Sequence, residues 1–183
     1  MKRKAQIGRR TKLILVLAGI TAASLIVLGL AARTHQASSV AYHPPAPTKL
    51  SGCVAMNGLA DRACTPGADI ATATKAQICK SGYASSVRHV TDATKAQVFA
   101  EYGITTHPEG AYEVDHLISL ELGGSNDIAN LWPEAADPVP GFHQKDQVEN
   151  YLHRQVCDGK LSLRQAQEEI AINWLQVYAT LVH

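Results

Sequence analysis

An uncharged run of 20 residues, Leu13–Ala32, separates a short basic N-terminus from the rest of this chain of 183 residues. The first 12 residues carry six Lys and Arg residues and no acid. The run matches the length of a bilayer-spanning helix, whereas a cleaved signal peptide has an apolar core of roughly 7 to 15 residues. Its length favours an uncleaved anchor, while the small residues "SSVA" at 38–41 suit a cleavage site. Either way residues 1–41 target a membrane, and the chain from Ala41 onward is exported, anchored in the inner membrane or secreted.

The charge of the exported part limits what it binds tightly. Residues 1–41 hold seven of the 17 Lys and Arg residues and none of the 16 Asp and Glu residues, so the rest has a formal net charge of −6. Proteins that bind nucleic acid by neutralising phosphates are normally basic. The composition therefore disfavours a tight, salt-resistant nucleic-acid binder and leaves room for an enzyme that binds a polyanion weakly.

All four cysteines lie in the exported part, where disulfides persist. Four cysteines allow three pairings. In one of them Cys53 and Cys64 close a small loop, and Cys79 with Cys157 ties the front of the domain to its back. The alternative, a cysteine metal site, has no Cys-x-x-Cys spacing to support it.

Turn residues and periodicity outline the organisation of the exported part. Residues 42–52 contain Pro and small residues without periodicity, which is typical of a linker, and we expect one domain at 53–183. Its front is loop-rich, with turns at Pro66-Gly67 and Ser81-Gly82. Helical spacing, caps and stop signals further along predict three helices, and alternation predicts one good strand. The helices are expected at 91–103, 143–159 and 162–182, and the strand at 111–118.

The stretch "YEVDHLISLELGGSNDIANLWPE" concentrates the residues that carry chemistry. Asp115 and His116 end the expected strand, and neighbours in a strand point to opposite sides unless the strand ends between them. Gly123 and Gly124 favour a turn, which would bring Asn130 back beside His116. His143 follows at the start of a helix. A carboxylate and an imidazole from separate elements can hold one divalent metal, while a free imidazole can deprotonate an attacking water.

"DHLISLELGGSNDIANLWPE" followed by "HQKDQVE" resembles the motif of the HNH endonuclease family, the ββα-metal finger. The likeness is to a bacterial exported group in which "CTPGA", "NLWPE" and "VC.GKLSL..AQ" recur in order, and it covers about Cys64 to Trp174. Ser119 stands where such motifs commonly have Pro, and the Cys-x-x-Cys pair of many HNH fingers is absent. The resemblance implies an α+β fold: a small ββα-metal core with additional helices and a loop-rich, disulfide-stabilised N-terminal part.

The resemblance also implies roles for individual residues. Asp115 would be a metal ligand, His116 the general base, Asn130 the residue that braces the His116 loop, and His143 the second ligand of one divalent ion (Mg²⁺, Mn²⁺, Ni²⁺ or Zn²⁺). Asp146, Glu149 and His153 are substitutes for His143, although His153 is more typical of a solvated helix residue.

Several other residues have a functional and a plain structural interpretation. Lys145 and Arg88 are candidates for contacting substrate phosphate, while single cations beside acids on a helix are usually exposed charges. Trp132 and Trp174 are more typical of core anchors than of base-stacking platforms. An Asp-His pair by itself is usually a structural pair.

The sequence thus predicts a divalent-metal-dependent endonuclease whose partners are DNA or RNA and, through its N-terminal segment, a membrane; no protein partner is evident. Two rival hypotheses remain. One is an exported cell-envelope binding or structural module that keeps an HNH-like scaffold without turnover, which the charge of −6 favours. The other is an envelope hydrolase that acts on another substrate.

Overall fold

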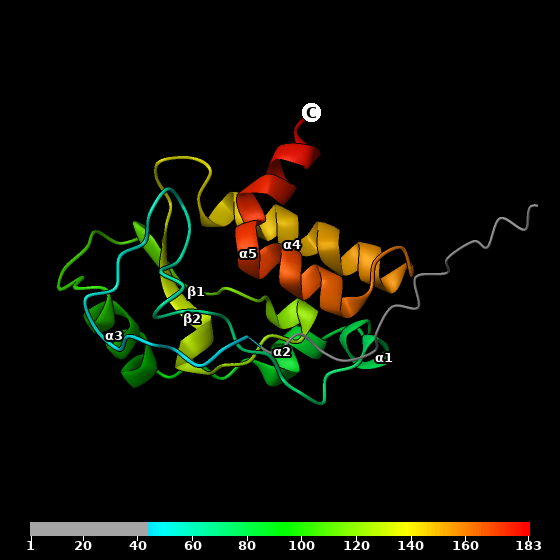
Figure 1. Cartoon of the computed structure of the whole chain (residues 1–183), viewed down its shortest axis with the longest axis horizontal. Helices are drawn as coiled ribbons and strands as arrows, with labels where there is room; N and C mark the ends of the chain where they lie inside the picture. The colour runs from blue at the N-terminus through cyan, green and yellow to red at the C-terminus, as the bar shows by residue number, and fades with distance from the viewer. Residues whose placement is uncertain (1–43) are drawn as a thin grey trace, which may run out of the picture. The chain divides into compact units, whose positions relative to one another are not determined.

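The computed structural model describes residues 44–183. These residues combine helices with one two-stranded sheet, so the predicted α+β class is confirmed (Figure 1). The membrane-targeting segment predicted at 1–41 lies outside the described residues. Within residues 44–183, no helix has the length and apolar character needed to cross a bilayer.

The described elements occur in a mixed order along the chain. They are α1 (Lys75–Ile78), α2 (Tyr83–Val87), α3 (Asp92–Glu101), β1 (Tyr112–His116), the 3-10 helices η1 (Leu120–Leu122) and η2 (Ile128–Asn130), β2 (Leu131–Ala135), α4 (Phe142–Cys157) and α5 (Leu163–Leu181).

Strands β1 and β2 form an antiparallel hairpin whose loop contains η1 and η2. Tyr112 pairs with Ala135 at the open end, and His116 pairs with Leu131 at the loop end. Asp115 faces Trp132 across the pair, so both side chains lie on one face of the hairpin. Helix α4 follows in the chain and packs against β1 and η1. The order of the unit is therefore strand, strand, helix.

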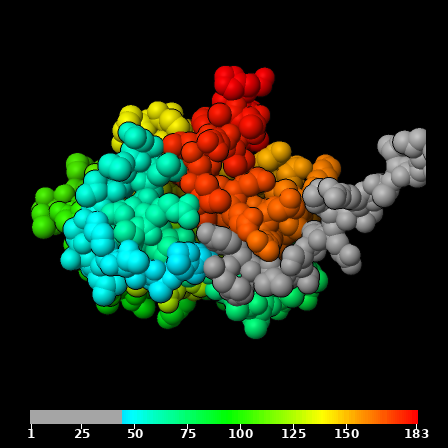
Figure 2. Space-filling model, viewed as in Figure 1, coloured from blue at the N-terminus to red at the C-terminus, as the bar shows by residue number. Residues whose placement is uncertain are grey.

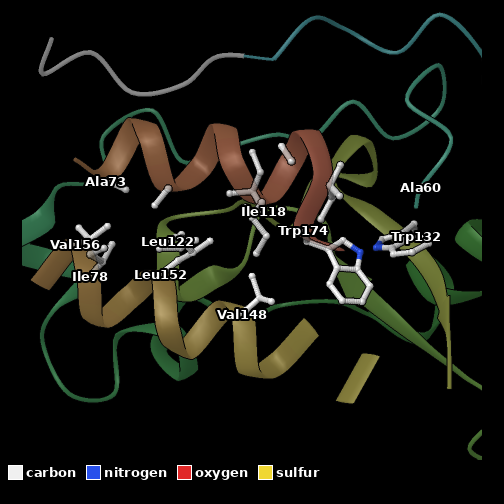
Figure 3. Close-up of a cluster of buried hydrophobic side chains, with 14 residues drawn as sticks. Ala60, Ala73, Ile78, Ile118, Leu122, Trp132, Val148, Leu152, Val156 and Trp174 are labelled. Atoms are coloured by element: carbon white, nitrogen blue, oxygen red, sulfur yellow. The ribbon is translucent and has the colours of Figure 1, made fainter. Parts of the chain in front are cut away.

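Helices α4 and α5 lie side by side and enclose most of the core (Figures 1 and 3). On α4, Val148, Leu152 and Val156 recur at intervals of four residues and are completely buried. Trp132 and Trp174 belong to the same hydrophobic cluster, which confirms that they are core residues. The buried members are Ala60, Ala73, Ile78, Leu117, Ile118, Leu122, Trp132, Val148, Leu152, Val156, Ala166, Ile170, Ala171 and Trp174.

Helix α5 begins as its capping residues predict but is kinked in its second half. The Ser162 side chain accepts a hydrogen bond from Gln165 N, which caps the first turn. Asn173 has non-helical angles (φ −165°, ψ 84°), and its side chain accepts a bond from Gln176 N at 3.2 Å. This side chain caps the segment that follows it. The single helix expected at 162–182 is therefore two helical segments joined at Asn173.

Two disulfides stabilise the domain. One closes a loop within its front part, and the other joins the front part to the back. Cys53 pairs with Cys64, and Cys79 pairs with Cys157, the last residue of α4. This is one of the three pairings that the sequence allows, and disulfides are typical of an oxidising compartment.

In Figure 2 the first described segment, in cyan, lies on the same face as α5, in orange to red.

Candidate functional site

Asp115 and His116 end β1, and strand alternation turns their side chains to opposite faces of the hairpin. Asp115 turns toward α4, where its Oδ2 lies 2.6 Å from Lys145 Nζ. His116 turns toward the hairpin loop, where its Nε2 lies 3.2 Å from Asn126 Oδ1. The Asp115 side chain is 16% exposed, so solvent reaches it. The whole His116 residue is only 2% exposed. The two neighbours therefore have separate sets of partners.

Lys145 is completely buried, which rules out the exposed helix charge that the sequence allowed. Its Nζ forms ion pairs with Asp115 and with Glu149 one turn along α4, and donates to the His116 carbonyl oxygen at 2.8 Å. The three N–H groups of an ammonium thus meet three protein oxygens. Burial opposes the charge, but Asp115 and Glu149 outweigh it and raise the pKa of Lys145 above its usual range. Lys145 is therefore a buried cation.

Glu134 lies on β2, two residues after Trp132, on the same face of the hairpin as Asp115. Its carboxyl is buried, and within residues 44–183 no donor bonds to either oxygen. Burial and the Asp115 charge raise the pKa of Glu134 to about 10, against the opposing charge of Lys145. The Glu134 carboxyl therefore keeps its proton at neutral pH.

The charge of Asp115 depends on these neighbours. Burial favours the neutral carboxyl, but the Lys145 charge outweighs burial and lowers the pKa of Asp115 below its usual value. Asp115 is thus ionised at neutral pH. On the other side of Lys145, Glu149 Oε2 accepts a bond from Ser119 Oγ at 2.8 Å, and burial raises the pKa of Glu149 to about 7.

Asn126 fixes the tautomer of His116. Its Nδ2 donates to the Val87 carbonyl at 2.7 Å, and its Oδ1 accepts from His89 N at 3.0 Å, so the oxygen faces His116 Nε2. An amide oxygen only accepts, so Nε2 carries the ring proton and Nδ1 holds the lone pair. Burial lowers the pKa of His116 despite the opposite influence of Asn126 and Asp115. The ring is therefore neutral near pH 7, as a general base requires.

Asn130 holds the hairpin loop together from within. Its buried side chain accepts from Ile118 N at 2.9 Å and from Ala68 N at 3.2 Å, and donates to the carbonyls of Ile118 and Ser125, each at 2.9 Å. The loop also requires a glycine at 124, because a Cβ there would lie 1.7 Å from the Ile118 carbonyl oxygen. Asn130 thus joins the segment after His116 to the far side of the loop.

His143, the predicted second metal ligand, is the second residue of α4 and is exposed. Its ring centroid lies 4.3 Å from that of Phe142. The α4 residue that contacts Asp115 is Lys145, two positions further on. A ligand role for His143 stays a prediction.

Arg88, a predicted phosphate contact, is exposed at the C-terminal end of α2. Its charge helps to lower the pKa of His116 and opposes the raised pKa values of Glu113 and Asp146. Arg88 therefore lies close enough to the end of β1 to act on it electrostatically. Contact with a substrate stays a prediction.

The Asp115 carboxylate is engaged by Lys145, and a metal-ligand role for Asp115 stays a prediction. Between residues 44 and 183, one group of three potential ligands lies within reach of a single ion, with its ligand atoms within 4.8 Å of one another, and Asp115 is not in it. That group is Cys79, His153 and Cys157. It could bind an ion as thiolates and imidazole, but its two sulfurs are joined in a disulfide.

The expectation that His153 is solvated is wrong. His153 Nε2 lies 3.1 Å from the Ile78 carbonyl oxygen and 3.5 Å from Cys157 Sγ, and the residue is half-buried. The physical reason is the Cys79–Cys157 disulfide, which holds the end of α1 against α4.

Sequence reasoning missed Glu134 and Asn126 as members of the site. Asn126 follows Gly123 and Gly124 in the expected turn, where an Asn is usually a turn residue. Glu134 follows Trp132 and Pro133 in an otherwise apolar segment, and such an isolated acid is the signal that was available. Its place in the site follows from the pairing of β1 with β2, which puts Glu134 on the same face of the hairpin as Asp115.

The chain has no match among protein-family models, among curated proteins or among solved structures. The fold and site define an α+β domain with two disulfides, whose hairpin and following helix enclose a buried group of charges.

Proposed function

We propose that this protein hydrolyses phosphodiester bonds in nucleic acid, with His116 as the general base. The observation that carries the proposal is a neutral His116 whose Nε2 is held by Asn126, which leaves Nδ1 as the basic atom. Two further features support it. The hairpin and α4 have the strand, strand, helix order of the ββα unit that the sequence resembles, and Asn130 braces the loop as that resemblance implies.

The reaction assigned to His116 is the attack of water on phosphorus. His116 Nδ1 takes a proton from the water as its oxygen bonds to phosphorus. The bond to the leaving ester oxygen breaks, that oxygen takes a proton from solvent, and one product end keeps the phosphate. The exposed guanidinium of Arg88 would attract the substrate phosphate toward the end of β1.

The assay is cleavage of plasmid DNA and of RNA by the full chain, with and without Mg²⁺, Mn²⁺, Ni²⁺ or Zn²⁺. We expect wild type to nick the substrate and His116→Ala to abolish nicking while circular dichroism and thermal unfolding show an intact fold. His183→Ala is the matched control, because His183 is exposed at the C-terminus. Equal behaviour of wild type and His116→Ala across metals and pH would refute the mechanism.

A second candidate is an exported binding or structural module that keeps this scaffold without turnover. The full burial of Lys145 favours it, because a buried ion-paired cation contributes little attraction for a polyanion. This candidate predicts no cleavage of DNA, RNA or small phosphodiesters. Cleavage of small phosphodiesters alone would instead favour an envelope hydrolase with another substrate.

A further inference from the structure

The Lys145 ammonium lies where oxygens from two parts of the fold converge. The end of β1 supplies the Asp115 carboxylate, with Nζ to Oδ2 at 2.6 Å, and the His116 carbonyl at 2.8 Å. Helix α4 supplies the Glu149 carboxylate. Carboxylate and carbonyl oxygens are the ligands that Mg²⁺ and Ca²⁺ prefer. The fold thus forms an oxygen-lined cation site, and the Lys145 ammonium occupies it.

A divalent ion cannot share this site with Lys145. An ion bound to the same Asp115 oxygen would lie within a few ångströms of the ammonium, and like charges at that distance repel strongly in a buried setting. Glu134 of β2 lies on the same face of the hairpin as Asp115, so Asp115 stands between Lys145 of α4 and this buried carboxyl.

We infer that Lys145 is the resident cation of this site, holding the Asp115 carboxylate and the His116 backbone in the place of a divalent metal. The inference deepens the proposed function and rests on it, because it makes the hydrolysis independent of added metal. The Lys145 side chain is only 1% exposed, so it acts as a positioning residue through Asp115 and His116 and does not touch substrate.

The first test is metal binding by the full chain. After removal of metals with a chelator, Mn²⁺ is titrated into wild type and into Asp115→Asn and followed by electron paramagnetic resonance. We expect the two titrations to coincide, because Asp115 binds Lys145 and no ion. One-to-one Mn²⁺ binding to wild type that Asp115→Asn removes would overturn the inference.

Two substitutions of Lys145 provide a matched pair. Lys145→Ala opens the space between Asp115 and Glu149, whereas Lys145→Met fills that space without charge or a hard ligand. We expect Lys145→Ala to bind Mn²⁺ at least about tenfold more tightly than Lys145→Met, which is about 1.4 kcal/mol of binding free energy. Circular dichroism checks whether both variants are folded. Equal Mn²⁺ binding by two folded variants contradicts the inference, and if either variant unfolds, the comparison of wild type with Asp115→Asn decides alone.

The metal dependence of cleavage is a further readout, because a lysine with a purely structural role would not make cleavage independent of divalent metal. We expect wild-type cleavage of plasmid DNA or RNA to persist in excess EDTA. Cleavage that requires a divalent ion would overturn the inference and leave the hydrolase proposal standing. The absence of cleavage under every condition would reject the hydrolase proposal, while the Mn²⁺ titrations would still decide whether Lys145 occupies the cation site.

Discussion

Four ionisable residues meet where α4 packs on the hairpin, and their protonation states depend on one another. Lys145 and Glu134 are buried, and Asp115 and Glu149 are partly buried. Asp115 is ionised against Lys145, while Glu134 keeps its proton. A third carboxylate charge at this place would lack a partner, and an unpaired buried charge costs several kcal/mol. Protonation of Glu134 avoids this cost. The fold therefore sets the charge of each residue, and the sequence pattern alone does not predict it.

Glu134→Gln tests this protonation through stability. The folded-state pKa of about 10 lies above the unfolded value near 4.5, so the stabilising proton is fully effective below about pH 4.5 and its contribution is lost as pH rises toward 10. Gln resembles the protonated acid and does not titrate. We expect the unfolding free energy of wild type to fall relative to Glu134→Gln by up to about 1.4 kcal/mol per pH unit between about pH 5 and 9.

Urea unfolding at several pH values measures the difference. Glu109→Gln, at an exposed position, serves as the control and should follow wild type. Parallel pH profiles for wild type and Glu134→Gln would mean that Glu134 is ionised in the folded protein.

Arg88→Ala tests the electrostatic environment of His116. Burial is the largest cause of the lowered pKa of His116, and the Arg88 charge acts in the same direction. A base with a lowered pKa loses activity only when pH falls below its ordinary value near 6.5. We expect Arg88→Ala to move the acid limb of the rate profile to higher pH, because the charge that helps to lower the pKa of His116 is removed. Initial cleavage rates from pH 4.5 to 8 provide the measurement, and a shift to lower pH would contradict the assignment.

At the scale of elements, local signals predicted the helices whose caps and periodicity are strong. Helix α3 begins after Thr91, whose side chain accepts a bond from Thr94 N, and α4 is followed by Gly159 at φ 76°, as expected. Alternation did not identify β2, although the resemblance to a ββα unit implied a second strand. Leu131–Ala135 lacks a polar–apolar alternation and contains Pro133, which argues against a central strand. A two-stranded sheet has only edge strands, where Pro is tolerated. The kink at Asn173 and the short helices α1 and α2 depend on capping and packing that periodicity does not reveal.

The site was predictable to a similar extent. Asp115, His116 and Asn130 stand out because they follow one another at informative spacing around a glycine turn. The contribution of Lys145 depends on which face of α4 meets the hairpin, and that of Glu134 depends on strand register. Such tertiary information lies beyond a local pattern.

Gly124→Ala tests how closely the hairpin loop is packed. A Cβ at this position would lie 1.7 Å from the Ile118 carbonyl oxygen and 3.0 Å from Asn130 Nδ2, so the backbone must move and the Asn130 bonds must weaken. We expect a loss of at least about 3 kcal/mol in unfolding free energy. Gly110→Ala is the comparison, because Gly110 has positive φ and open space around it, and should cost about 1 kcal/mol. Urea unfolding measures both, and equal losses would contradict the close approach at Gly124.

At the scale of the whole molecule, residues 42–183 carry a formal net charge of −6 although the proposed substrate is a polyanion. Lys145, a cation buried inside the site, is compensated by Asp115 and Glu149. Attraction for nucleic acid therefore rests on exposed cations such as Arg88. Binding to a polyanion should accordingly be weak and fall as salt concentration rises.

The two disulfides constrain the unfolded chain to different extents. Cys79–Cys157 spans 78 residues and joins the end of α1 to the end of α4, whereas Cys53–Cys64 spans 11 residues near the front. In the chain-entropy model these loops correspond to about 4.5 and about 3 kcal/mol. Replacing Cys79 and Cys157 by Ser should therefore lower the unfolding free energy by about 1.5 kcal/mol more than the same change at Cys53 and Cys64. Urea unfolding of the two double variants under non-reducing conditions measures the difference, and a larger loss for the short loop would show that local packing, not chain constraint, governs the stabilisation by these bonds.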